Sequence, residues 1–86
     1  MKIYILVRYK YDEDGGNYRT QNIFIDTSED NCINCFKKKT GTEKLIDSKF
    51  VPNLINLDYP SNMKHRTIYY DGEGEGWWSI QEWEIE

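Results

Sequence analysis

Two cysteines, Cys32 and Cys35, lie three residues apart near the start of a predicted helix that follows a predicted strand. A CxxC pair in this context is typical of thioredoxin-type redox sites, in which a lowered thiol pKa activates the nucleophile. Glu29 and Asp30 lie one turn earlier, where their negative charge opposes a thiolate. A zinc site would need two further ligands, and the sequence holds one histidine, His65. A thiol redox domain is one alternative function. The competing interpretation is structural, with both cysteines acting as small apolar residues that pack on a sheet.

Residues 71–82 have the spacing of an EF-hand calcium loop. Acids occupy positions 1, 3, 5 and 12, glycine position 6 and a hydroxyl position 9; these residues are Asp71, Glu73, Glu75, Glu82, Gly76 and Ser79. Against this pattern, glutamate replaces the usual Asp or Asn at two positions, the flanks are strand-like, and the loop is single. A calcium-binding domain is the other alternative function, and a glycine-rich acidic hairpin loop is the competing structural interpretation.

The sequence predicts no catalytic site. His65 stands between Lys64 and Arg66, without a partner for general base catalysis, and no nucleophile motif surrounds any serine. The alternating glycines after Asp71 are separated by carboxylates, which repel phosphate. We therefore expect a protein that is not an enzyme and that has no cofactor and no catalytic residue, and we assign no metal ligand.

The charge of the chain is concentrated at its C-terminal end. Residues 1–66 carry nine acids and eleven bases, whereas residues 67–86 carry six acids and no Lys or Arg, so the two parts sum to +2 and −6. A segment of one sign repels nucleic-acid phosphates and attracts basic surfaces. The expected partner is a basic protein surface, with no direct nucleic-acid contact.

Aromatic residues gather in the same acidic segment. The chain has seven Tyr, three Trp and three Phe, and all three tryptophans lie between residues 77 and 83. Aromatic anchors beside a charged rim are typical of protein-binding surfaces. The predicted function is a small acidic regulatory module that binds a protein, for example a phage-type inhibitor whose carboxylates imitate a nucleic-acid backbone. The predicted partner-binding residues are Asp71, Glu73, Glu75, Trp77, Trp78, Glu82 and Glu84.

The first half of the chain predicts two strands and a helix. Residues 2–11 alternate with β-branched and aromatic side chains, turn formers follow, and residues 18–26 read as the returning strand. Residues 28–39 predict a helix, because a hydroxyl and two acids begin it, three lysines close it and Gly41 permits a left-handed stop.

The second half is less regular. Residues 42–50 are compatible with a short second helix, residues 54–59 with a short strand, and residues 60–66 with a loop. Residues 67–71 and 77–85 predict two further strands. The last strand has apolar residues on both faces, which predicts either that both faces are covered or that a bulge near Gln81 shifts the register.

This order predicts one α+β domain over residues 1–86, a mainly antiparallel sheet of four or five strands with one main helix packed on one face. The predicted core is Ile3, Ile5, Val7, Ile23, Ile33, Phe36, Ile80 and Trp83. The longest apolar run has five residues, too short for a membrane span or a signal peptide, so we expect a cytoplasmic protein that does not bind membranes.

Three stretches resemble a known group of proteins. These are the opening residues 1–6, the passage from the second strand into Asp26-Thr27-Ser28-Glu29, and the closing alternating acidic residues 80–86. They resemble the small, uncharacterised ββαβ domains of bacteria and their phages. Residues 40–66 are longer than that pattern expects. The resemblance implies the α+β fold and carries no functional residue with it.

Overall fold

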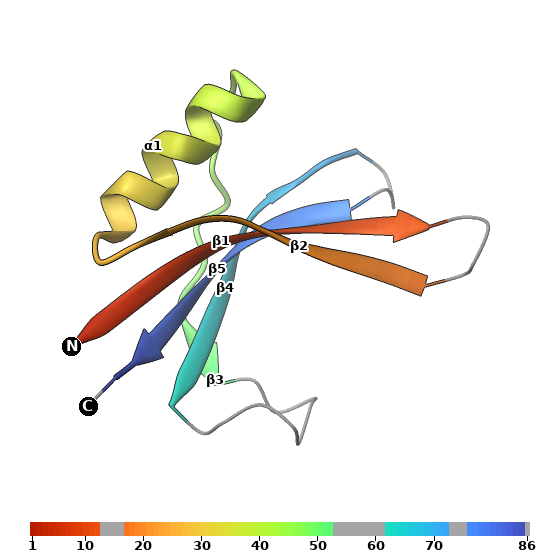
Figure 1. Cartoon of the computed structure of the whole chain (residues 1–86). Helices are drawn as coiled ribbons and strands as arrows, with labels where there is room; N and C mark the ends of the chain where they lie inside the picture. The colour runs from red at the N-terminus through yellow and green to blue at the C-terminus, as the bar shows by residue number, and fades with distance from the viewer. Residues whose placement is uncertain (13–16, 53–61, 73–75, 86) are drawn as a thin grey trace.

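The computed structural model describes residues 1–12, 17–52, 62–72 and 76–85. The elements along the chain are β1 (Lys2–Asp12), β2 (Asn17–Asp26), α1 (Glu29–Thr40), β3 (Val51–Pro52), β4 (Met63–Tyr70) and β5 (Gly76–Glu84). The strands form one antiparallel sheet in the order β2-β1-β5-β4-β3, with α1 lying against one face (Figure 1). The predicted α+β fold, a mainly antiparallel sheet of four or five strands with one main helix on one face, is confirmed, and the sheet has five strands.

The predicted helix forms almost at its expected bounds because both of its ends are capped. Ser28 is the N-cap, and its side chain accepts a hydrogen bond from the Asn31 backbone N–H. Gly41 takes the left-handed conformation at φ 71°, and its N–H donates to the Lys37 carbonyl over 2.8 Å. The helix therefore begins and ends where local chemistry satisfies its terminal backbone groups.

The core lies between α1 and the sheet. Its buried cluster consists of Leu6, Cys32, Phe36, Ile68, Trp78 and Ile80. Phe36 is at its centre, with ring centroids 5.5 Å from Tyr69 and 5.4 Å from Trp78.

The predicted core is partly wrong. Phe36 and Ile80 belong to the cluster, and Ile23 and Ile33 pack at its margin. Val7 is fully buried as predicted, although it lies outside this cluster. Ile3, Ile5 and Trp83 are only half-buried. The reason is that both faces of β1 are apolar, and α1 covers the face of Tyr4 and Leu6 rather than that of Ile3 and Ile5.

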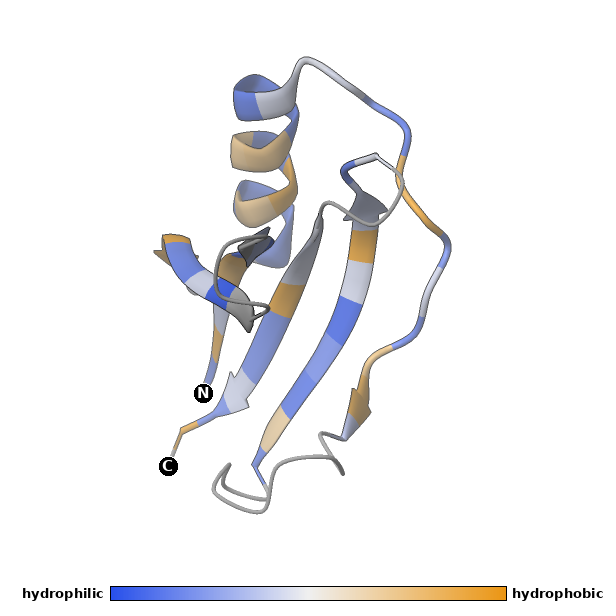
Figure 2. Ribbon diagram, turned by 90° about the vertical axis from the view of Figure 1, so that its right-hand side faces the viewer, coloured by the Kyte–Doolittle hydropathy of each residue, from blue (hydrophilic) through white to orange (hydrophobic). Residues whose placement is uncertain are grey.

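The segment after α1 is not a helix. Residues 41–50 have no regular secondary structure and run along the outer side of β4 to β3 (Figure 2). The Ile46 N–H donates to the Ile68 carbonyl over 2.8 Å, and the Ser48 hydroxyl donates to the Thr67 carbonyl over 2.5 Å. The carbonyl groups of β4 thus accept hydrogen bonds from this segment, so that its polar groups are satisfied without the internal hydrogen bonds of a helix.

The strand β4 begins inside the predicted loop of residues 60–66. Met63 is buried and lies opposite Trp83, and His65 lies opposite both Gln81 and Val51. Pairing on both sides therefore extends the strand to Met63, which composition alone does not indicate. The predicted strand at residues 54–59 lies outside the described residues.

Both faces of β5 are covered, as the first of the two interpretations expects. Trp78 and Ile80 are buried on the α1 face, and Ser79 and Gln81 are buried on the other. The pairing of β5 with β1 is continuous through Gln81. Register shifts occur instead between Leu6 and Val7, against β2, and between Thr67 and Tyr69 in β4.

The two ends of the described chain lie side by side (Figure 1). The Met1 amino group donates to the Ile85 carbonyl over 2.9 Å, and the Ile85 N–H donates to the Met1 carbonyl over 2.7 Å. Within the described residues, no helix has the length and apolar character needed to cross a membrane.

Candidate protein-binding surface

A row of three aromatic side chains crosses the sheet where β4 turns into β5. Tyr9 lies opposite Trp77, and Trp77 lies opposite Tyr70, so all three share the face away from α1. The Tyr9 and Trp77 rings stack, with centroids 4.8 Å apart and planes 11° apart. Tyr70 is 63% exposed. We call Tyr9, Trp77 and Tyr70 the aromatic row.

Asp71 follows Tyr70 in the chain, but its carboxylate lies on the α1 face of the sheet, opposite to the face of the aromatic row. Its backbone N–H donates to the Gly76 carbonyl over 2.9 Å, which holds the two strands together at the turn. Its carboxylate forms an ion pair with Arg8, whose guanidinium also lies 5.1 Å from the centre of the Trp78 ring. Asp71 therefore remains partly exposed, but its charge is balanced within the chain.

Glu73 and Glu75 lie outside the described residues. Their place in the sequence is between Asp71 and Gly76, which are themselves joined by a hydrogen bond.

Trp78 is part of the core. It is 5% exposed, and its ring meets Phe36 edge to face. Among the side chains that the structure describes, its Nε1 is the one buried nitrogen or oxygen without a hydrogen-bond partner. Adjacent tryptophans on a strand point to opposite faces, and this pair leaves Trp77 half-buried on the face away from α1 and Trp78 in the core.

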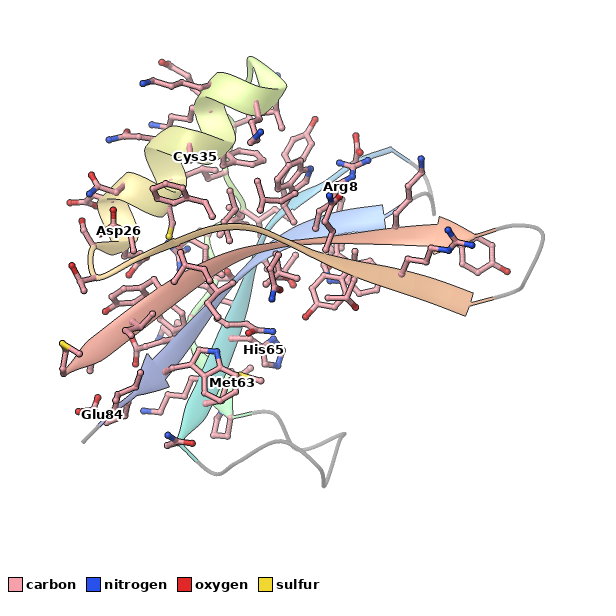
Figure 3. The ribbon with its side chains drawn as sticks, viewed as in Figure 1. Arg8, Asp26, Cys35, Met63, His65 and Glu84 are labelled. Atoms are coloured by element: carbon pink, nitrogen blue, oxygen red, sulfur yellow. The ribbon has the colours of Figure 1, made fainter. Side chains whose placement is uncertain are left out.

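Glu82 and Glu84 lie at the other end of β5. Glu82 pairs with the Lys2 amine at 3.6 Å, and Glu84 pairs with the Met1 amino group at 3.7 Å. Figure 3 shows Glu84 beside the chain ends. Eight residues of strand separate Glu84 from Gly76, a distance of about 26 Å. The described members of the predicted partner-binding set therefore do not form one surface. The Asp71 carboxylate lies with Arg8 and Trp78 on the α1 face, and Trp77 lies on the opposite face.

The EF-hand spacing does not bring its two described acidic residues, Asp71 and Glu82, together. Asp71 is at the turn, whereas Glu82 lies six residues along an extended strand from Gly76, roughly 20 Å away. The flanking elements are strands, where a calcium loop of this type requires helices. Within the described part of the chain, no three His, Cys, Asp or Glu side chains form a group suited to a metal ion.

The two thiols differ in their surroundings. Cys32 is fully buried, and its thiol contacts the Tyr4 carbonyl at 3.6 Å. Burial, reinforced by the negative charge of Asp26, raises the pKa of Cys32 to about 11. Cys35 is half-buried, and neither cysteine forms a disulfide in the structure. A thiol with a raised pKa is a poor nucleophile, so this environment opposes redox chemistry at Cys32.

His65 lies in β4 on the face away from α1, together with Met63 (Figure 3). Its cross-strand neighbours are Gln81 and Val51, which give it no acidic partner in the sheet. Tyr9 and Tyr70 were not among the residues predicted to bind a partner. Their place beside Trp77 depends on the pairing of β1 and β4 with β5 and, for Tyr70, on the register shift between Thr67 and Tyr69, which local alternation does not show.

No family model, curated protein or solved structure matches this chain.

Proposed function

We propose that this protein is a non-catalytic protein-binding domain that contacts a basic partner surface through the aromatic row and through the acidic segment that precedes Trp77 in the sequence, which consists of Asp71, Glu73 and Glu75. The observation that carries the proposal is the aromatic row itself, in which Tyr70 is 63% exposed at the end of the sheet that holds Asp71. Stacked aromatic rings offer contact area with little conformational entropy to lose, as binding anchors require.

The acidic segment supports attraction of a basic surface. Residues 67–86 hold six acids and no Lys or Arg, and Glu73 and Glu75 follow Asp71 at alternate positions, separated by glycines. Opposite charge accelerates association over distances near the Debye length of about 8 Å. An inhibitor whose carboxylates take the place of nucleic-acid phosphates is one form of this function.

Calcium binding and thiol redox chemistry have less support. The extended β5 separates Asp71 from Glu82, and burial raises the pKa of Cys32. The described acidic residues are therefore too far apart to share a calcium ion, and the Cys32 thiol is too weak an acid for redox chemistry near neutral pH.

The test begins with capture of partners from a host-cell extract on the immobilised protein. Wild type is compared with E73K/E75K and with a matched double charge reversal, E43K/D47K, whose sites are exposed in the segment after α1. We expect a partner that E43K/D47K retains and E73K/E75K loses. For the isolated partner, E73K/E75K should reduce the association rate several-fold at physiological salt and leave thermal unfolding unchanged.

The aromatic row is tested separately with Tyr70→Ala. Because an anchor mainly holds a complex together, this change should accelerate dissociation and leave association nearly unchanged. Equal capture and equal rates for wild type, E73K/E75K and Tyr70→Ala would rule out this end of the sheet as the binding surface.

A further inference from the structure

A groove of about 510 Å³ lies between α1 and the edge strand β2. Phe24 and Asp26 line it from β2, and Asn31, Cys35, Lys38 and Lys39 line it from α1. Figure 3 shows Asp26 at the start of α1 and Cys35 further along the helix. The volume lies within the range of ligand-binding pockets in proteins. This groove has no residue in common with the aromatic row or the acidic segment of Asp71, Glu73 and Glu75.

The two ends of the groove differ in charge. At one end, the Asp26 carboxylate accepts hydrogen bonds from the Asn31 amide over 2.9 Å and from the Ser28 N–H over 3.1 Å, so its charge is satisfied within the chain. At the other end lie the exposed Lys38 and Lys39. The groove therefore presents cations to a ligand and keeps its one carboxylate occupied.

The strand beside the groove has an open edge. Within the described sheet, β2 pairs with β1 alone, so half of its backbone N–H and C=O groups point away from the sheet. Its ten residues contain no Pro and no Lys, the residues that commonly block edge pairing. The register shift opposite Leu6 and Val7 precedes Phe24, so the residues from Phe24 to Asp26 pair regularly beside the helix.

The dimensions of the groove match an extended chain. Asn31 and Lys38 are seven helical residues apart, about 10 Å, which three extended residues span. A segment antiparallel to β2 would run from Asp26 towards Phe24, because β2 runs in the opposite sense. Its C-terminal end would then approach Lys38 and Lys39, two turns along α1 from the contact between Asn31 and Asp26.

We propose that this groove binds an extended peptide segment of a partner protein, which pairs with β2 as an added strand and places an acidic side chain or a terminal carboxylate against Lys38 and Lys39. Backbone hydrogen bonds to β2 supply affinity in this mode, and the groove selects the side chains. The inference goes beyond the proposed function, because it concerns a second surface with the opposite charge preference.

A displayed library of random twelve-residue peptides, selected on the full chain, tests the proposal. We expect enriched peptides that carry Asp or Glu near the C-terminal end of an alternating apolar stretch. Binding should shift the backbone amide resonances of residues 23–26. The K38Q/K39Q variant should weaken binding roughly fivefold, as two exposed ion pairs allow, whereas K44Q/K64Q, at exposed lysines outside the groove, should not.

Backbone pairing is tested with the selected peptide of highest affinity. Two variants of it carry an N-methyl group on the backbone, one at a chosen residue and the other at the next residue. N-methylation should abolish binding at one of the two neighbouring positions and be tolerated at the other, because only alternate N–H groups of an added strand face β2. E73K/E75K should bind the peptide like wild type, so a failure here is distinct from a failure of the proposed function. The inference is overturned by no enrichment, by equal binding to K38Q/K39Q, by tolerance of methylation at both positions, or by self-association of the chain through β2 in sedimentation equilibrium.

Discussion

Two arginines show how single residues organise the α1 face of the sheet. Arg66 forms an ion pair with Glu29 at the start of α1, and its guanidinium lies 5.3 Å from the centre of the Phe50 ring. Arg8 is placed in the same way between Asp71 and Trp78. Each guanidinium thus meets a carboxylate and an aromatic ring, the two partners that its planar, weakly hydrated cation favours. The helix face of the sheet can therefore hold charge next to its core.

The thiols provide a prediction at the residue scale. With the pKa of Cys32 raised to about 11 by burial, roughly one molecule in ten thousand carries the thiolate at pH 7. Iodoacetamide at pH 7 should therefore modify Cys35, which lines the groove, well before Cys32. Peptide mass spectrometry over time measures both rates. In urea the two rates should converge, and a native Cys32 that reacts faster than free glutathione would contradict the prediction.

Asp26 provides a prediction about pH. The side-chain hydrogen bond from Asn31, and then the backbone N–H of Ser28, hold the pKa of Asp26 below its usual value of 3.8. A carboxyl with a lowered folded-state pKa stabilises the fold at pH above its unfolded pKa, and this stabilisation is lost as pH falls through the folded value. Asp26→Asn should therefore unfold at a lower temperature than wild type at pH 7, and the difference should shrink as the pH falls below the usual carboxyl pKa of 3.8.

The matched control for Asp26 is Asp47→Asn, at an exposed position in the segment after α1. Its melting temperature should follow that of wild type across the same pH range. A difference between wild type and Asp26→Asn that grows as the pH falls would show that the carboxylate does not act through its charged form.

At the scale of elements, the start of β5 depends on close approach to β1. Gly76 has φ 153°, and a Cβ at this position would lie 2.3 Å from the Tyr9 carbonyl oxygen. That oxygen belongs to the backbone of a paired strand, so it cannot move away without breaking the ladder. Gly41, with φ 71°, has no atom within 4 Å of its added Cβ. Substitutions at the two glycines therefore distinguish the cost of a steric clash at Gly76 from the cost of a left-handed backbone alone at Gly41.

Gly76→Ala should lower the free energy of unfolding by about 2 kcal/mol or more, because the clash adds to the cost of the dihedral angle. Gly41→Ala should cost about 1 kcal/mol, from its left-handed backbone alone. Urea denaturation followed by tryptophan fluorescence compares the two. Equal losses would mean that β5 can shift away from β1 at little cost.

At the scale of the whole molecule, stability depends on one small cluster. A chain of 86 residues has a free energy of unfolding of about 4–13 kcal/mol. Phe36 joins α1 to both β4 and β5 through its contacts with Tyr69 and Trp78. Loss of this ring removes contacts from three elements at once.

Phe36→Ala should therefore lose about 3–5 kcal/mol, a large part of the total. Ile25→Ala is the control, because Ile25 is 59% exposed, and it should change the free energy of unfolding by less than about 1 kcal/mol. Guanidinium denaturation measures both. A Phe36→Ala protein with an unchanged midpoint would show that the sheet is stable without its helix.

The elements of the first half of the chain could be predicted from the sequence because their signals are local. The Ser28 cap, the acids after it, the three lysines and Gly41 all act within one or two turns of the helix that they delimit. The alternation of β1 and the turn formers after it are equally local. The acidic, aromatic composition of the C-terminal hairpin is likewise a property of the sequence alone.

The tertiary structure decided which face of each strand is buried and which side chains meet. Tyr4 and Leu6 compete with Ile3 and Ile5 on β1, and the position of α1 settles the choice, because an apolar strand is compatible with burial on either face. The same contacts bury Trp78, leave Trp77 beside Tyr9 and Tyr70, and separate Asp71 from Glu82 along β5. These arrangements depend on pairing between residues distant in sequence, which local patterns do not determine.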